Sequence, residues 1–126
     1  MAADKNNPSY YTLPLPNGAD APALARRYLA EHASWLEPDV LDDALLIVSE
    51  LVTNAIRHGQ PDIFLSLRND PPRVGVAIQD AGRHMPRLTD FAPGNTEPTG
   101  RGLLVVDALA DDWGVVPRES PPGKTI

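Results

Sequence analysis

Cysteine is absent from this chain of 126 residues, and so is any long apolar run. Without cysteine the chain has neither disulfides nor cysteine-ligated metals, which fits a reducing compartment. No apolar run reaches the roughly 20 residues that span a bilayer. The first ten residues are polar and lack the apolar segment of a secretory signal. These absences favour a cytoplasmic protein without a membrane partner.

Basic residues are also few. The chain has 11 Lys and Arg against 17 Asp and Glu, a net charge of -6. An acidic chain with scattered basic residues is a poor candidate for direct nucleic-acid binding. The phosphate-binding pattern G-x-x-x-x-G-K-[ST] is missing as well. The length and the apolar fraction of 42% fit one globular domain. We expect it over residues 10–126, after a disordered leader at residues 1–9.

The patterns along the chain predict an α/β two-layer sandwich, in which a mostly antiparallel mixed sheet carries three helices on one face. We expect Asp20 to cap the first helix, and Leu24, Tyr28 and Leu29 to lie against the sheet. The last strand is short, so either the natural protein continues past Ile126 or this edge is frayed. Strands are expected at residues 10–15, 63–68, 73–79, 112–118 and 124–126, helices at residues 21–32, 38–58 and 103–109, and a hairpin connection at residues 69–72.

The end of the second helix carries the first chemical motif. Glu50 and Asn54 are four residues apart, so they share one face of a helix. Glu50 can accept a proton or hold a water, and the side-chain oxygen of Asn54 suits Mg²⁺, which prefers oxygen ligands. The alternative is a helix with a solvated Glu, with Arg57 and His58 placed as cations at its C-terminal end.

Two further segments carry chemistry. Asp80 follows a strand and precedes Gly82, so a buried carboxylate there can accept the amine of an adenine. Gly100, Arg101 and Gly102 open a helix, whose N-terminus suits a phosphate. Each has a plain alternative, because the first is a common turn and the second can serve only a bend. Together the segments supply the parts of a nucleotide site.

Three stretches resemble a known family: E-L-V-T-N-A-I-R-H-G at 50–59, Q-D-A-G at 79–82 and T-G-R-G-L-L-V-V-D-A-L-A-D-D-W-G-V at 99–115. They look like the Bergerat-type (GHKL) ATP-binding superfamily of gyrase, heat-shock chaperones and histidine kinases. The likeness is greatest to its small stand-alone branch, the bacterial anti-sigma-factor serine kinases, and covers about residues 10–126. The resemblance implies the Bergerat fold, with ATP and Mg²⁺ as cofactors.

The resemblance also implies roles for single residues. Asn54 would hold Mg²⁺, Glu50 would act as the general base, and Asp80 would bind the adenine amino group beside Gly82. Residues 83–99 would form a lid over ATP. The other positions implied to contact the nucleotide are Arg57, His58, Thr99, Gly100, Arg101, Gly102, Leu103 and Thr125. His84 replaces the second glycine of the usual D-x-G-x-G pattern, so the resemblance predicts ATP binding more directly than phosphoryl transfer.

Three functions are compatible with these residues. The first is an ATP- and Mg²⁺-dependent kinase that phosphorylates a serine of an antagonist protein and also sequesters a sigma factor, in transcription regulation. The second is a non-catalytic switch, in which ATP orders the lid and the ordered surface binds a protein. The third, ranked well behind, is an interaction domain with a degenerate pocket. A homodimer is a further expectation, because the first strand lies at a sheet edge and such edges tend to be covered.

Overall fold

The computed structural model describes residues 9–82, 102–119 and 122–126, and the helices and strands within them follow the expected order. Residues 1–8 of the expected leader and the expected lid at residues 83–99 lie outside this part. The elements are β1 (Ser9–Leu15), α1 (Ala21–His32), α2 (Pro38–His58), β2 (Ile63–Asp70), β3 (Arg73–Asp80), α3 (Gly102–Leu109), β4 (Val116–Glu119) and β5 (Pro122–Thr125).

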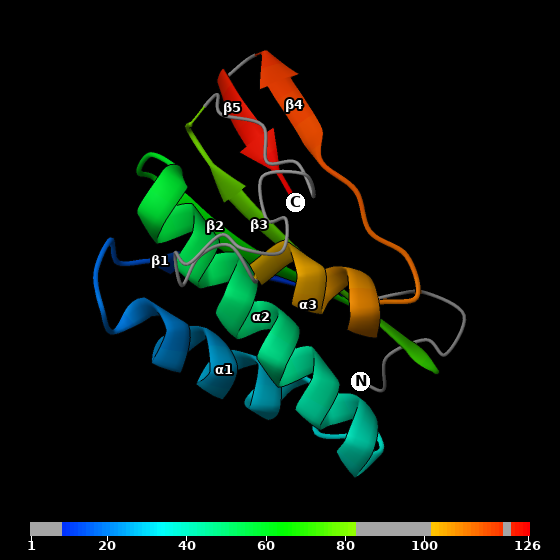
Figure 1. Ribbon diagram of the computed structural model, residues 1–126. Helices are drawn as coiled ribbons and strands as arrows, with labels where there is room; N and C mark the ends of the chain where they lie inside the picture. Colours follow the sequence, from blue (N-terminus) through cyan, green and yellow to red (C-terminus); the bar gives the residue numbers. More distant parts are fainter. Residues whose placement is uncertain (1–8, 83–101, 120–121) are drawn as a thin grey trace.

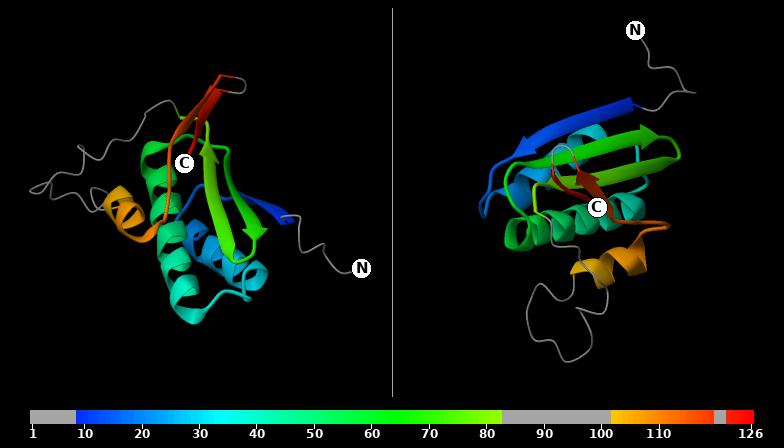
Figure 2. Two further views of the ribbon diagram at one scale, coloured as in Figure 1. Left: turned by 90° about the vertical axis from the view of Figure 1, so that its right-hand side faces the viewer. Right: turned by 90° about the horizontal axis from the view of Figure 1, so that it is seen from above.

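The strands form one sheet in the order β1-β2-β3-β5-β4. Every pairing between the described strands is antiparallel, so the sheet contains no parallel pair among them. The helices cover one face of the sheet, with α1 and α3 on either side of α2 (Figures 1 and 2). The predicted two-layer α/β sandwich is confirmed. Among the described residues, no helix combines the length and apolarity that a membrane span requires.

The long helix α2 is the centre of the helical layer. Its apolar residues recur at intervals of three and four, which turns one stripe towards the sheet. Pro38 stands at its start, where a missing N–H costs nothing. The sheet meets this stripe with the inward side chains of β2, which alternate as expected for a strand. The buried residues of this core include Val48, Leu51, Val52, Ala55, Ile63, Leu65 and Leu67.

The first helix differs from the prediction in two respects. Its buried residues are Ala21, Ala25 and Leu29, a stripe of period four, whereas Leu24 lies off this stripe and is 38% exposed. Of the three residues predicted to lie against the sheet, Leu29 is buried and Tyr28 packs partly buried against the core, whereas the prediction is wrong for Leu24. Asp20 stands at the N-cap position, but its backbone is already helical and its side chain makes no capping hydrogen bond. The predicted cap is wrong for that reason.

Two predicted boundaries also change. The β2–β3 ladder runs to the pair Asp70 and Arg73, so only residues 71–72 form the connection predicted at residues 69–72. Residues 112–115 are not a strand, and β4 begins at Val116. In that stretch Trp113 donates its indole N–H to Asp107 of α3 at 2.9 Å. This bond holds the segment against the helix rather than in the sheet.

Candidate functional site

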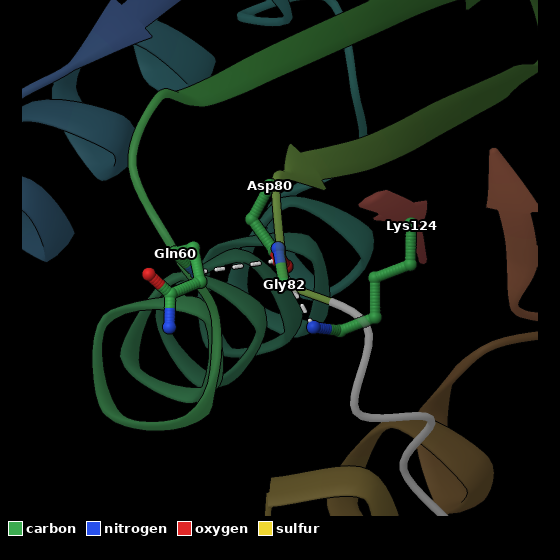
Figure 3. A network of polar contacts seen from close by, with 4 residues as sticks. All are labelled: Gln60, Asp80, Gly82 and Lys124. Carbon is green, nitrogen blue, oxygen red and sulfur yellow. Dashed lines mark hydrogen bonds and ion pairs between the residues drawn. The ribbon is translucent and has the colours of Figure 1, made fainter. Parts of the chain in front are cut away.

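The site is built around Asp80, the last residue of β3, whose side chain is 1% exposed. Its Oδ1 accepts hydrogen bonds from the backbone N–H of Gly82 at 2.6 Å and from that of Gln60 at 3.4 Å. The same oxygen lies 3.0 Å from the Nζ of Lys124. Figure 3 shows the three donors around this one carboxylate. One acidic group therefore joins the end of α2, the end of β3 and strand β5.

The partner Lys124 is placed by the register of the sheet. It lies directly opposite Asp80 in the antiparallel pair of β3 and β5, and residues opposite each other project from the same face. The Lys124 side chain is also 1% exposed. A buried charge is tolerated only when it is paired and hydrogen-bonded, and removing one partner of such a pair is strongly destabilising. The ion pair is thus an internal part of the site.

Two glycines allow the segments to approach this closely. A Cβ on Gly59, which directly follows α2, would lie 2.6 Å from the Cγ of Asp80. A Cβ on Gly82 would lie 2.9 Å from the Oδ1 of the same residue and 3.0 Å from the Cα of Gly59. The N–H of Ala81 adds a bond of 2.9 Å to the carbonyl of Gln60. The backbone after α2 and the backbone after β3 are therefore in direct contact.

The predicted residues on α2 lie on the last turns before this junction. Asn54 is 6% exposed and Glu50 is half-buried, whereas Arg57 and His58 are exposed. Asn54 precedes Gly59 by about 7.5 Å along the helix axis. The structure thus brings the amide of Asn54 and the carboxylate of Asp80 to the same end of the fold. Their contacts with a nucleotide stay predictions.

The third predicted segment is described only in part. Gly102 is the first residue of α3, which packs against α2, so its backbone stands at a helix N-terminus as expected. Thr99, Gly100, Arg101 and His84, together with the side chain of Leu103, lie outside the described residues. Thr125 lies in β5, half-buried and next to Lys124. Of the predicted phosphate site, the structure therefore describes only the start of α3.

The acceptor at this junction suits the amine of an adenine nucleotide. A carboxylate accepts hydrogen bonds, which is what the exocyclic amine of adenine needs. The missing side chain of Gly82 lets the backbone approach Asp80 and Gly59, because a Cβ there would lie 2.9 Å and 3.0 Å from their atoms. In the described part of the chain no three His, Asp or Glu residues cluster as a metal site. A Mg²⁺ held by one amide oxygen and by phosphates does not require such a cluster.

A cavity of about 670 Å³ lies between the helices α2 and α3 and the sheet. Its walls come from the first half of α2, the start of β3, the end of α3 and the residues that follow α3. Of the predicted site residues that are described, Thr125 alone lines it. The cavity is therefore distinct from the junction around Asp80.

Sequence reasoning missed Lys124, Gln60 and Gly59 as parts of the site. For Lys124 a partial signal exists, because it shares a strand face with Ile126, and an apolar neighbour at that spacing marks an inward face. Its partner lies 44 positions away in the sequence. Only the pairing of β3 with β5 brings the two together.

Comparison with known proteins supports this reading. A family model described as a histidine kinase-like ATPase domain matches residues 15–126, which is most of the chain. Two proteins called anti-sigma F factor, both from Bacillus licheniformis, are 29% identical to it over 103 residues. Each of these matches covers 71% of this chain and 70% of the relative. The fold, the motifs and the family match thus agree on a histidine kinase-like ATPase domain.

Proposed function

The chain belongs to the histidine kinase-like ATPase domain family, and from this premise we propose that it is an ATP- and Mg²⁺-binding regulator of the anti-sigma-factor kind. In its full form the proposal is a kinase that phosphorylates a serine of an antagonist protein and sequesters a sigma factor in the cytoplasm. The names of the two relatives support the anti-sigma part. The family supports ATP binding.

The observation that carries the proposal is the buried carboxylate of Asp80 beside Gly82, at the end of the helix that bears Asn54. In the proposed complex Asp80 accepts the adenine amine, and Asn54 offers an oxygen to Mg²⁺. Glu50, one turn earlier on the same helix, acts as the general base towards the serine hydroxyl. The N-terminus of α3 at Gly102 faces phosphate. Phosphoryl transfer needs little more than metal, positioning and a base.

The burial of Asp80 adds a condition. At 1% exposure the carboxylate is covered by protein atoms, so a nucleobase reaches it only after some of these atoms move. This favours, as a second candidate function, the non-catalytic switch in which nucleotide binding rearranges a surface that a partner protein recognises. For this switch, replacing Glu50 by Ala leaves ATP affinity and partner binding nearly unchanged. In the kinase it removes phosphate transfer.

The first test is calorimetry with ATP, with and without Mg²⁺, on the wild type and on Asn54→Ala. We expect binding in the micromolar range for the wild type, and loss of the Mg²⁺-dependent part of the affinity in the variant. Arg68→Met, a change on the exposed surface of β2, is the control and keeps both. An absence of ATP binding by the folded wild type contradicts the proposal and favours a plain interaction domain.

The second test separates the two functions. The protein is incubated with labelled ATP and candidate antagonist proteins, and phosphoserine is measured. Phosphoserine that depends on Glu50 supports the kinase. ATP binding without phosphoserine supports the switch. The proposed homodimer, through β1, which is an edge strand among the described strands, is tested by sedimentation of the same preparations.

A further inference from the structure

The start of β3 has a neighbouring strand on one side only. On that side, β2 pairs with residues 73–79 of β3. On the other side, β5 pairs with Gln79 and Asp80 and bonds to Ile78 (Figure 1). Among the described strands, none pairs with this second edge of residues 73–77. A strand edge left open in this way is a template for pairing with a further strand.

The hydrogen-bonding groups at this open edge belong to Val74 and Val76. Ile78 donates its N–H to the carbonyl of Ile126 at 2.8 Å and accepts the N–H of Ile126 at 3.0 Å. In an antiparallel sheet, every second residue of a strand directs its N–H and C=O groups to the same edge. Val76 and Val74 therefore direct theirs to the edge that Ile78 uses. Backbone groups of this kind need partners, which another strand would supply.

The same edge borders the cavity of about 670 Å³. The consecutive residues 72–76 all line this cavity. Because neighbouring side chains of a strand project to opposite faces, a wall of consecutive residues is the edge of the strand, with its backbone, and not one of its faces. Thr125 and Ile126 line the cavity as well, so the line of β5 leads into it. The apolar residues of the helical wall are Ala44, Ile47, Leu51, Val106, Leu109 and Ala110.

We infer that the β3 slot, formed by the open edge at Val74 and Val76 and the cavity beside it, binds an extended segment of a partner protein as a further antiparallel strand in line with β5. In such strand addition, main-chain hydrogen bonds supply affinity and pockets for alternate side chains supply specificity. Residues opposite Val74 and Val76 would project into the cavity, because opposite residues share a face and both valines pack against the core. The inference goes beyond the proposed function, since it uses neither ATP nor the junction around Asp80.

The charges around the cavity determine the chemistry of this segment. Three exposed carboxylates line it, those of Asp43, Asp111 and Asp112, against one guanidinium, that of Arg73. They belong to the first half of α2, to the residues after α3 and to the start of β3, which lie on one side of the molecule (Figure 1). Electrostatic complementarity favours a cation there. A segment antiparallel to β3 ends beside Arg73, so we expect apolar residues at alternate positions followed by Lys or Arg.

The probe is a peptide with blocked ends, Thr-Ile-Thr-Ile-Thr-Lys, whose two isoleucines would lie opposite Val76 and Val74. Binding is measured by calorimetry and by the fluorescence of Trp113, which lines the cavity, in a Trp35→Phe background. We expect a dissociation constant of about 100 μM. Serine in place of both isoleucines removes the apolar contacts, and methylation of both isoleucine amides removes their hydrogen bonds. Each change is expected to weaken binding about tenfold or more.

Two protein variants and one lengthened chain complete the test. Asp43→Asn is expected to weaken binding of the Lys peptide about threefold. Asp42→Asn is the matched control, because Asp42 is an exposed neighbour on the same helix that does not line the cavity, and it keeps the wild-type affinity. A chain with the peptide sequence appended after Ile126 fills the slot from within. It is expected to have a higher Tm and to bind the free peptide at least tenfold more weakly.

The outcomes separate the possible occupants. Binding that the two peptide changes weaken, that follows Asp43 and that the appended strand blocks supports the inference. Equal binding of the methylated peptide overturns it, since an apolar cavity without strand pairing then explains the affinity. A free peptide that does not bind also overturns it, and a raised Tm of the lengthened chain then assigns the slot to residues that continue β5. A wild-type dimer that the peptide dissociates assigns the slot to a second copy and overturns the partner. None of these outcomes depends on ATP binding, so failure of the proposed function is measured separately.

Discussion

Replacing Gly59 by Ala tests the contact on which the site depends. The added methyl would lie 2.5 Å from the carbonyl oxygen of Ala55, 2.6 Å from the Cγ of Asp80 and 2.8 Å from its Oδ1. Ordinary contacts between carbon atoms are about 3.5–4.0 Å, so the methyl is about 1 Å too close to the Cγ of Asp80, and it also clashes with the carbonyl oxygen of Ala55. One of these neighbours is backbone that already accepts the N–H of Gly59 at 2.8 Å. It cannot swing aside as a side chain can.

The expected loss of stability follows from two opposing terms. Overpacking of this kind costs about 1–3 kcal/mol, and the backbone clash places Gly59→Ala at the upper end. Replacing Gly by Ala also reduces the freedom of the unfolded chain, which stabilises by about 0.4–1 kcal/mol. We therefore expect a net loss of about 2 kcal/mol in the free energy of unfolding. For a domain of this size that lowers Tm by roughly 8 °C.

Urea unfolding, followed by circular dichroism and by the fluorescence of Trp35 and Trp113, measures the change, and an unchanged m-value indicates that the same surface is exposed. Gly18→Ala is the matched control, because a Cβ at Gly18 meets no atom within 4 Å. We expect it to be as stable as the wild type or slightly more so. If Gly59→Ala and Gly18→Ala differ by less than about 0.5 kcal/mol, α2 does not end against Asp80 and the site is wrongly assembled.

Three further outcomes are expected. Glu50→Gln keeps ATP affinity within about twofold but lowers phosphate transfer at least a hundredfold, as loss of a general base does, in a single-turnover assay. Lys124→Met costs about 3–5 kcal/mol in urea unfolding because it removes one partner of a buried ion pair, whereas Arg68→Met, which breaks an exposed pair, costs less than about 1 kcal/mol. Leu65→Ala, at 0% exposure, costs about 2–5 kcal/mol. Leu104→Ala, at 42% exposure, stays within about 0.5 kcal/mol of the wild type.

Most of the fold could be predicted from local sequence patterns. The spacing of apolar residues in α2 predicted its bounds and its buried face, because apolar residues three and four positions apart lie on one face of a helix. The alternation of β2 and β3 predicted a hairpin, but not its end. Asn69 and Asp70 have turn-forming side chains, yet they pair with Val74 and Arg73 because the ladder of the sheet overrides local preference. In α1 the small residues Ala21 and Ala25 were buried instead of Leu24, since close packing favoured a narrow stripe.

The site residues also divide into those that local sequence patterns predict and those that depend on the folded sheet. Glu50 and Asn54 were found because both sit in one continuous stretch, where spacing alone places them on a common face. Lys124 was not, because its role comes from the antiparallel register that sets it opposite Asp80. A lysine in a short strand beside a turn reads as a solvated charge until the strand order is known. The sequence could therefore place the carboxylate of Asp80, whereas its buried ion pair with Lys124 depends on a strand pairing that only the folded sheet provides.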